Sequence, residues 1–368
     1  MAAIRMNDFA NEPATLIDEQ LIACERVVRS GWWILGNEVS SFEREFADWI
    51  GATAAIGCAN GLDAIEIGLR ALGVGAGDEV ITTPMTAFAT VLGILRAGAS
   101  PVLADIDSNT GMLDPESVRR CVTSRTKAIV LVHLYGQGGP IEELLAIAQE
   151  FGLKIIEDCA QSHGAKVNGR SVGTLGDVGT WSFYPTKNLG AIGDAGALTT
   201  SDAQLAETAR SLRNYGQTVR YVHEKVGMNS RLDELQAAFL RVRLRYLDEW
   251  TARRRAIARE YANGIRNPHV RVLPTPGDRS RHVHHLFVVL SARRDELQEH
   301  LKRHNIESLI HYPVPIHRQS PCLTLSRDPQ GLARADQHAA TCLSIPCHPG
   351  LDSHAVGSVV DAINRFGE

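Results

Sequence analysis

The chain has 368 residues, of which 44% are hydrophobic and 22% are charged, and 38 basic against 42 acidic residues leave a net charge of −4. This balance excludes the strongly basic class of nucleic-acid-binding proteins. No apolar stretch approaches the ~20 residues of a membrane helix, and residues 1–10 lack the apolar core of a secretory signal, so we expect a cytoplasmic protein long enough to be an enzyme.

In chain order, the sequence first predicts two helices, over 18–30 and 38–49. Apolar strands then alternate with amphipathic helices. The strands are expected over 79–82, 101–106, 127–134 and 153–157, and the helices over 62–72, 115–122 and 140–151. This alternation predicts an α/β fold with a large, mostly parallel sheet covered on both faces. Such sheets bind ligands at the carboxyl ends of their strands, so functional residues are expected just after strands.

The C-terminal part of the chain has a different pattern. A long helical pattern over 231–262 is followed by a strand over 282–291, a helix over 293–304, a strand over 307–311 and a helix over 353–366. We therefore predict a large domain over residues 1–245 and a smaller C-terminal α+β domain over residues 246–368. The N-terminal helices of residues 1–50 are expected to pack beside the small domain.

Cysteines and glycines narrow the choice of cofactor. The seven cysteines are scattered and form no Cys-x-x-Cys pair, so they predict reduced thiols and neither a disulfide framework nor a zinc site. Asp158 and His163 are two candidate metal ligands without a third nearby, and we predict no metal. Gly73, Gly75 and Gly77 follow a helix and precede a strand, the reverse of a dinucleotide-binding turn, which argues against a nicotinamide cofactor.

Lys187 is the first candidate for chemistry. It is one of only six lysines, and it lies in the stretch 180–197, TWSFYPTKNLGAIGDAGA. Aromatic and small apolar neighbours would partly desolvate the amine and lower its pKa, which makes it a nucleophile able to form a Schiff base. The alternative is a solvated loop lysine, which composition alone favours.

Two further candidates lie beside predicted strand ends and helix starts. Asp158 follows a buried strand, where an acid could keep a pyridinium nitrogen protonated; a helix-capping or strand-end aspartate is the alternative. The turn 59–62 leads into a helix whose first amides could bind a phosphate, with ordinary capping as its alternative. A phosphate-binding turn, an acid and a Schiff-base lysine are together the three anchors that pyridoxal phosphate needs.

Several segments are similar in sequence to the motifs of one enzyme family. They are SGWWILGNEVSSFEREF (30–46), residues 60–84, IIEDCAQSHG (155–164), residues 182–193, NSRLDELQAA (229–238), HYP (311–313) and LSIPCHPGL (343–351). In this order they resemble the sugar aminotransferases of the DegT/DnrJ/EryC1/StrS family. The resemblance implies the aspartate-aminotransferase fold type, that is, a type I pyridoxal-phosphate transferase, and a homodimer with active sites at the subunit interface.

The resemblance implies roles for residues around the cofactor ring. Lys187 would bind the cofactor covalently and later carry the proton between the reacting carbon atoms, and Asp158 would pair with the pyridine nitrogen. Gln161 would lie against the ring and its phenolic oxygen. Where many relatives have a stacking aromatic residue, this chain has Ala87 followed by Phe88, and either residue could contact the ring.

The resemblance also implies how the cofactor phosphate is held. The backbone amides of Gly61 and Leu62 and the hydroxyl of Ser182 would bind it. Asn229 of the partner subunit would reach the same phosphate. Some relatives have histidine in place of the lysine and catalyse deoxygenation, but this chain keeps Lys187.

The implied reaction transfers an amino group from glutamate to a nucleotide-linked keto sugar, with ping-pong kinetics. Residues 213–223 and 229–235 look most like the subgroup that aminates C3 of nucleotide-linked 3-keto-6-deoxyhexoses. In that subgroup the sugar site would be lined by Tyr184, His311 and Tyr312, with Arg220 and Tyr221 from the partner chain.

Three alternatives remain at this stage. The same chemistry could act at C4 of a 4-keto sugar, or the chain could be a regulatory paralogue that binds the cofactor without turnover. The third alternative is a soluble α/β protein with a different ligand. The sequence does not identify the nucleotide, the sugar stereochemistry or the pathway of the product.

Overall fold

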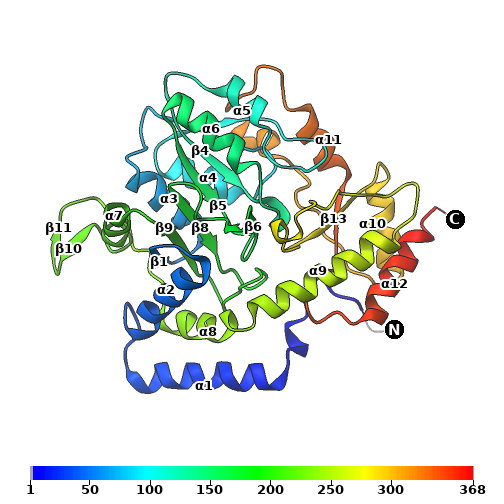
Figure 1. Ribbon diagram of the computed structural model, residues 1–368, viewed down its shortest axis with the longest axis horizontal. Helices are drawn as coiled ribbons and strands as arrows, with labels where there is room; N and C mark the ends of the chain where they lie inside the picture. Colours follow the sequence, from blue (N-terminus) through cyan, green and yellow to red (C-terminus); the bar gives the residue numbers. More distant parts are fainter. Residues whose placement is uncertain (1–2, 368) are drawn as a thin grey trace.

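The computed structural model describes residues 3–367, and an eight-stranded sheet forms its centre (Figure 1). The strand order is β1-β9-β8-β5-β4-β2-β3-β14, and all neighbours pair in parallel except those of β9. This arrangement confirms the predicted α/β fold with a mostly parallel sheet. The strands are β1 (Ala54–Cys58), β2 (Glu79–Thr82), β3 (Ser100–Leu103), β4 (Thr126–Val132), β5 (Lys154–Asp158), β8 (Val178–Ser182), β9 (Gly196–Thr200) and β14 (Ser326–Arg327).

Both faces of the sheet are buried, as the continuous apolar strands predict. In β4, Ala128 and Val130 belong to one apolar cluster, whereas Ile129 and Leu131 belong to another, because successive side chains point to opposite faces. Helices between the strands supply the covering layers. They are α3 (Gly61–Ala71), α4 (Phe88–Arg96), α5 (Pro115–Cys121), α6 (Ile141–Phe151) and α7 (Ala203–Arg213).

The N-terminal helices pack on the large sheet region. Helices α1 (Ala14–Ser30) and α2 (Asn37–Ile50) both pack against α8 (Glu234–Leu244), and α2 also contacts β1. The long predicted helix is in fact two helices, α8 and α9 (Leu247–Gly264), because the chain turns at residues 245–246. No glycine or proline signals this break.

The C-terminal region has its own antiparallel sheet of β12 (Arg271–Val272), β13 (Phe287–Leu290) and β15 (Cys342–Ile345). A separate apolar cluster lies between this sheet and the helices α9, α10 (Arg294–Arg303) and α12 (Ser353–Asn364). The strand expected over 307–311 forms only a single bridge, between Leu309 and Ser344. The remaining helix of this region is α11 (Ala333–Thr341).

Several backbone connections cross the predicted domain boundary, and two of them join elements at its two ends. Ile4, ahead of α1, pairs with Ile306 in the C-terminal region. In the other direction β14 leaves the C-terminal region and pairs in parallel with β3 at the edge of the large sheet. The division at residues 245 and 246 therefore stays a prediction, and the large sheet includes one strand from beyond it.

Two small hairpins complete the structure: β6 (Lys166–Val167) with β7 (Arg170–Ser171), and β10 (Gln217–Val219) with β11 (Val222–His223). The second hairpin projects from one end of the molecule (Figure 1). Within residues 3–367, no helix is both long enough and apolar enough to cross a membrane.

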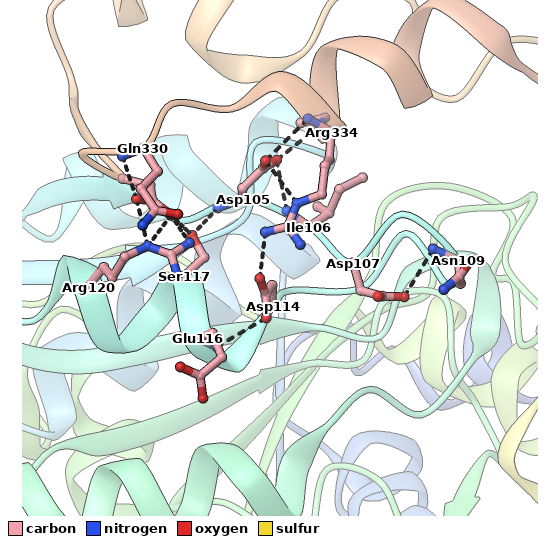
Figure 2. Close-up of polar contacts among 12 residues, drawn as sticks. Asp105, Ile106, Asp107, Asn109, Asp114, Glu116, Ser117, Arg120, Gln330 and Arg334 are labelled. Carbon is pink, nitrogen blue, oxygen red and sulfur yellow. Dashed lines mark hydrogen bonds and ion pairs between the residues drawn. The ribbon is translucent and has the colours of Figure 1, made fainter.

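A buried polar network fixes the C-terminal segment to the large sheet (Figure 2). The carboxylate of Asp328 is fully buried, and it accepts hydrogen bonds from Arg120 at 2.6–3.2 Å, from the hydroxyl of Ser117 and from the backbone N–H of Gln330 at 2.8 Å. Nearby, Asp105 accepts a hydrogen bond from the backbone N–H of Ala335 at 3.0 Å, at the start of α11. These bonds hold β14 and α11 against the edge of the sheet.

We expect Asp328→Ala to lower the free energy of unfolding by about 3 kcal/mol, because it leaves the guanidinium of Arg120 and a backbone N–H without their acceptor. Urea unfolding followed by circular dichroism measures the loss. The control is Glu150→Ala, which removes an exposed ion pair with Arg119 and should leave the unfolding midpoint nearly unchanged. Equal effects of the two variants would contradict a structural role for the buried network.

Candidate active site

The carboxyl ends of three strands, β1, β8 and β5, lie at one edge of the sheet. Strands β5 and β8 run in parallel and end at Asp158 and Ser182. Strand β1 runs in the same direction as β8, because both pair antiparallel with β9, and it leads through residues 59–60 into α3. The predicted cluster of functional residues just after strands is therefore present at this edge.

The start of α3 lies against the end of β8. A Cβ atom added to Gly61 would come within 2.7 Å of the Cβ of Ser182, so only glycine permits this approach. The side chain of Asn60 accepts a hydrogen bond from the backbone N–H of Asp63 at 2.8 Å. The amides of Gly61 and Leu62 belong to the first turn and have no acceptor within the helix. With the hydroxyl of Ser182 they form a set of donors suited to a phosphate.

Asp158 is a buried carboxylate held from both sides. Its Oδ2 accepts a hydrogen bond from the hydroxyl of Thr90 at 2.8 Å, and its Oδ1 accepts one from the backbone N–H of Ala160 at 3.2 Å. A second hydroxyl, that of Thr86, lies 2.7 Å from the hydroxyl of Thr90. Burial raises the pKa of Asp158, and the hydrogen bonds and the charge of Lys187 oppose this rise only in part. A cation next to Asp158 would relieve the cost of its buried charge.

Lys187 lies on the loop after β8, where its backbone N–H donates to the carbonyl of Tyr184 at 2.8 Å. Its side chain is half-buried. Burial lowers the pKa of Lys187 to about 8, although the nearby carboxylate of Asp158 works in the opposite direction. This environment favours the nucleophilic amine over the alternative of a solvated loop lysine.

Gln161 and Tyr312 come together beside this pair. The side-chain amide of Gln161 donates to the hydroxyl of Tyr312 at 3.1 Å. Burial and the charge of Asp158 raise the pKa of Tyr312, and burial together with the charge of Lys187 lowers the pKa of His311 to about 4. The structure therefore brings these expected ring and sugar residues to the same place as Lys187 and Asp158.

Three expected residues are not brought to Lys187 within one chain. Arg220 and Tyr221 lie at the exposed turn of the β10–β11 hairpin, where the guanidinium of Arg220 stacks on the ring of Tyr221 at 5.0 Å. Asn229 is exposed and forms a bridge with Asn214. Their expected contribution from a partner subunit stays a prediction.

The segment expected to contact the ring is the amino end of α4. Ala87 is the residue just before this helix and Phe88 is its first residue, with 37% of the phenylalanine exposed. Which of the two contacts the ring stays a prediction. Thr90, one turn further along, is a site residue that the sequence reasoning missed, because nothing in a single sequence distinguishes a buried threonine next to a carboxylate from any other.

A cluster of three possible metal ligands and one unpaired histidine lie in the strands and loops around the site. His133, Glu157 and Cys159 form the one cluster of three possible metal ligands within residues 3–367. Glu157 accepts hydrogen bonds from His133 at 2.9 Å and from the backbone of the 173–176 loop, so this cluster fixes that loop to β5. His163 is buried with neither ring nitrogen bonded, and its pKa is lowered to about 3 by burial.

The donor set fits pyridoxal phosphate. The Ser182 hydroxyl and the first amides of α3 lie where Gly61 leaves no room for a Cβ atom. The pKa of the buried Asp158 is raised because nearby groups only partly offset its burial, and Lys187, with a lowered pKa, lies close to it. These match the phosphate, the ring nitrogen and the aldehyde carbon of that cofactor.

Comparison with known proteins identifies the family. The model of the DegT/DnrJ/EryC1/StrS aminotransferase family matches residues 15–364. The chain belongs to this family. It is a pyridoxal-phosphate-dependent aminotransferase with the type I fold, as the sequence resemblance predicted.

Three similar proteins show the range of names within the family. A dTDP-3-amino-3,6-dideoxy-alpha-D-galactopyranose transaminase from Aneurinibacillus thermoaerophilus is 49% identical over 94% of this chain and 94% of its own length. A protein from Geobacillus stearothermophilus, named a pleiotropic regulatory protein, is 44% identical over 99% of this chain and 98% of its own length. The crystal structure of Streptomyces venezuelae DesV in complex with a ketimine intermediate is 42% identical, with a TM-score of 0.96 over 100% of this chain and 99% of DesV.

We expect the amine of Lys187 to titrate near pH 8 in the folded, cofactor-free aminotransferase, because burial disfavours its charged form. Brief labelling with acetic anhydride between pH 6 and 11, followed by peptide mass spectrometry, measures the titration. The same residue in the urea-unfolded chain is the control and should titrate near ~10.4. Identical midpoints in the two states would contradict the buried environment of the lysine.

Proposed function

We propose that this aminotransferase transfers an amino group from glutamate to C3 of a dTDP-linked 3-keto-6-deoxyhexose in amino-sugar biosynthesis. The observation that carries the proposal is the joining of Lys187, Asp158 and the α3 phosphate cradle at one sheet edge, with His311 and Tyr312 beside them. The name of the Aneurinibacillus relative supports amination at C3 and a dTDP carrier.

In the proposed mechanism, bound pyridoxal phosphate supplies an electron-withdrawing ring that stabilises negative charge on the reacting carbon. The Gly61 and Leu62 amides and the Ser182 hydroxyl anchor the phosphate. Asp158 keeps a proton on the ring nitrogen, and Thr90 orients the carboxylate through its 2.8 Å hydrogen bond.

Lys187 moves protons between the reacting carbon atoms. An amine with a pKa of about 8 exchanges protons readily near neutral pH, because neither of its forms is strongly favoured. Gln161, three residues after Asp158, would lie against the ring. Tyr184 on the lysine loop and the His311–Tyr312 segment form the sugar side of the site within this chain.

We place Arg220, Tyr221 and Asn229 in the active site of a partner subunit, in a homodimer. Supporting this, α1 and the turn after it expose a run of large apolar side chains, namely Leu21, Ile22, Val28, Trp32 and Trp33. The β10–β11 hairpin likewise projects with Val219 and Tyr221 exposed (Figure 1). Apolar surface of this kind is typical of an interface between subunits, and an arginine there suits the diphosphate of a nucleotide sugar.

We place the reaction in the cytoplasm. All seven cysteines are free thiols, and six of them are buried, which agrees with a reducing compartment. C4 amination and a regulatory role without turnover remain the alternatives, the second because of the Geobacillus relative's name. The presence of both Lys187 and Asp158 at one site favours turnover over that role.

The test of substrate and position is a single incubation. We expect the holoenzyme, glutamate and a dTDP-3-keto-6-deoxyhexose to give an amine at C3, located by NMR, with 2-oxoglutarate formed in equal amount. A matched incubation with a dTDP-4-keto sugar should give no amine. Product only from the 4-keto sugar would replace C3 by C4, and the absence of any amine with both sugars would support the regulatory alternative.

The shared active site predicts complementation between two defective chains. Lys187→Ala should have no activity, and Arg220→Ala should lose about 10-fold or more in kcat/KM for the sugar, because a charge-assisted hydrogen bond is lost. In a hybrid dimer purified with two tags, one site has both native residues, so about half of the wild-type activity should return. A hybrid with no more than half of the activity of the Arg220→Ala dimer would place Arg220 in the same chain's site as Lys187, and full activity of the Arg220→Ala dimer itself would place Arg220 outside the site.

A further inference from the structure

We infer that Tyr135 is a positioning residue that keeps the sugar-side segment His311–Tyr312 aligned with Gln161. The inference rests on the proposed function, which assigns Gln161 to the cofactor ring and His311 and Tyr312 to the sugar. Tyr135 lies in the short 3-10 turn Leu134–Gly136 at the end of β4, and its side chain is 2% exposed. No sequence motif singles it out.

Tyr135 is held in an unusual backbone conformation. Its φ is +61°, in the left-handed region that bulky residues rarely adopt. The next residue, Gly136, has a φ of +96°, and a Cβ atom there would lie 2.8 Å from the carbonyl oxygen of Gln161. The turn is therefore pressed directly against the backbone of Gln161. Such conformations persist where the surrounding structure fixes them, often at functional sites.

Hydrogen bonds link the four residues in a closed ring. The backbone N–H of Tyr135 donates to Oε1 of Gln161 at 2.6 Å, and its hydroxyl donates to the carbonyl of His311 at 2.6 Å. Nε2 of Gln161 donates to the hydroxyl of Tyr312 at 3.1 Å, which completes the ring because His311 and Tyr312 are consecutive. The ring joins the carboxyl edge of the large sheet to the C-terminal region.

His338 fixes the direction of the Tyr135 hydroxyl. The carbonyl of His311 can only accept, so it takes the single hydroxyl proton of Tyr135. His338, whose Nε2 lies 2.9 Å from the same hydroxyl oxygen, must then be the donor to it. Its imidazole is 3% exposed and belongs to α11. The hydroxyl is thus bonded on both sides, and it has one orientation.

Removal of this hydroxyl should affect one half-reaction only. In ping-pong kinetics each substrate has its own kcat/KM. Tyr135→Phe loses the bond to His311 but keeps the backbone bond to Gln161. We therefore expect kcat/KM for the keto sugar to fall about 3- to 10-fold, the range for one neutral hydrogen bond. The kcat/KM for glutamate and the Kd for pyridoxal phosphate should stay within twofold of wild type.

Tyr261→Phe is the matched control. The Tyr261 side chain is equally buried in the C-terminal core, and its hydroxyl donates to the carbonyl of Pro346 at 2.8 Å, with no bond to Gln161, His311 or Tyr312. This variant loses the same kind of bond, so it should lose similar stability in urea unfolding without altering either kcat/KM. An equal effect of the two variants on the sugar reaction would overturn a positioning role for Tyr135.

A second measurement needs no sugar. Hydrogen–deuterium exchange of the holoenzyme should be faster over residues 309–316 in Tyr135→Phe than in wild type or Tyr261→Phe, because the segment has lost the bond from Tyr135 to the carbonyl of His311. Unchanged exchange there, or equal falls in both half-reactions, would refute the inference. If wild type aminates no nucleotide keto sugar, the proposed function fails, and the exchange comparison still decides the role of Tyr135.

His338→Leu serves if Tyr135→Phe does not fold. It removes the donor to the Tyr135 hydroxyl and leaves the tyrosine in place. The same separation of the two half-reactions and the same faster exchange over 309–316 are expected. Wild-type values for both measurements in a folded His338→Leu protein would count against the fixed hydroxyl orientation on which the positioning role of Tyr135 rests.

Discussion

The buried charge of Asp158 is the constraint on which the site depends. A carboxylate at the end of an interior strand loses its hydration, and the protein replaces only part of it with the Thr90 hydroxyl, the Ala160 amide and the nearby Lys187 amine. The unmet cost is what makes the location suited to a protonated ring. Burial disfavours the charged form of Lys187 as well, and therefore lowers its pKa while it raises that of Asp158. One desolvated environment thus suits both a protonated ring and a reactive amine.

The parallel sheet explains why residues far apart in the chain meet here. Parallel strands present their carboxyl ends at one edge, so Asp158, Ser182 and the start of α3 come together although they are far apart in the sequence. The alternation of strand and helix made this edge predictable. The apolar strands and the glycine after α3 are local signals, and each appears in the structure where its pattern indicated.

The parts that the sequence could not predict depend on contacts between distant residues. Nothing local marks the break between α8 and α9, the sparse pairing at Leu309, or the passage of β14 into the large sheet. The same holds for Thr90 and Tyr135, whose roles follow from their bonds to Asp158, Gln161 and His311 rather than from residue type. Arg220, Tyr221 and Asn229 lie exposed and are not brought to Lys187 within one chain, so their proposed roles depend on a partner subunit.

The pairing of β14 with β3 has a consequence for how the two regions move and unfold. A C-terminal region that contributes a strand to the other region's sheet cannot rotate away as an independent body without breaking that strand and the buried Arg120–Asp328 bond. The chain is therefore interlocked rather than hinged at this edge. Unfolding of the C-terminal region would remove the edge strand β14 from the large sheet and expose the backbone of β3. The two regions should therefore unfold cooperatively.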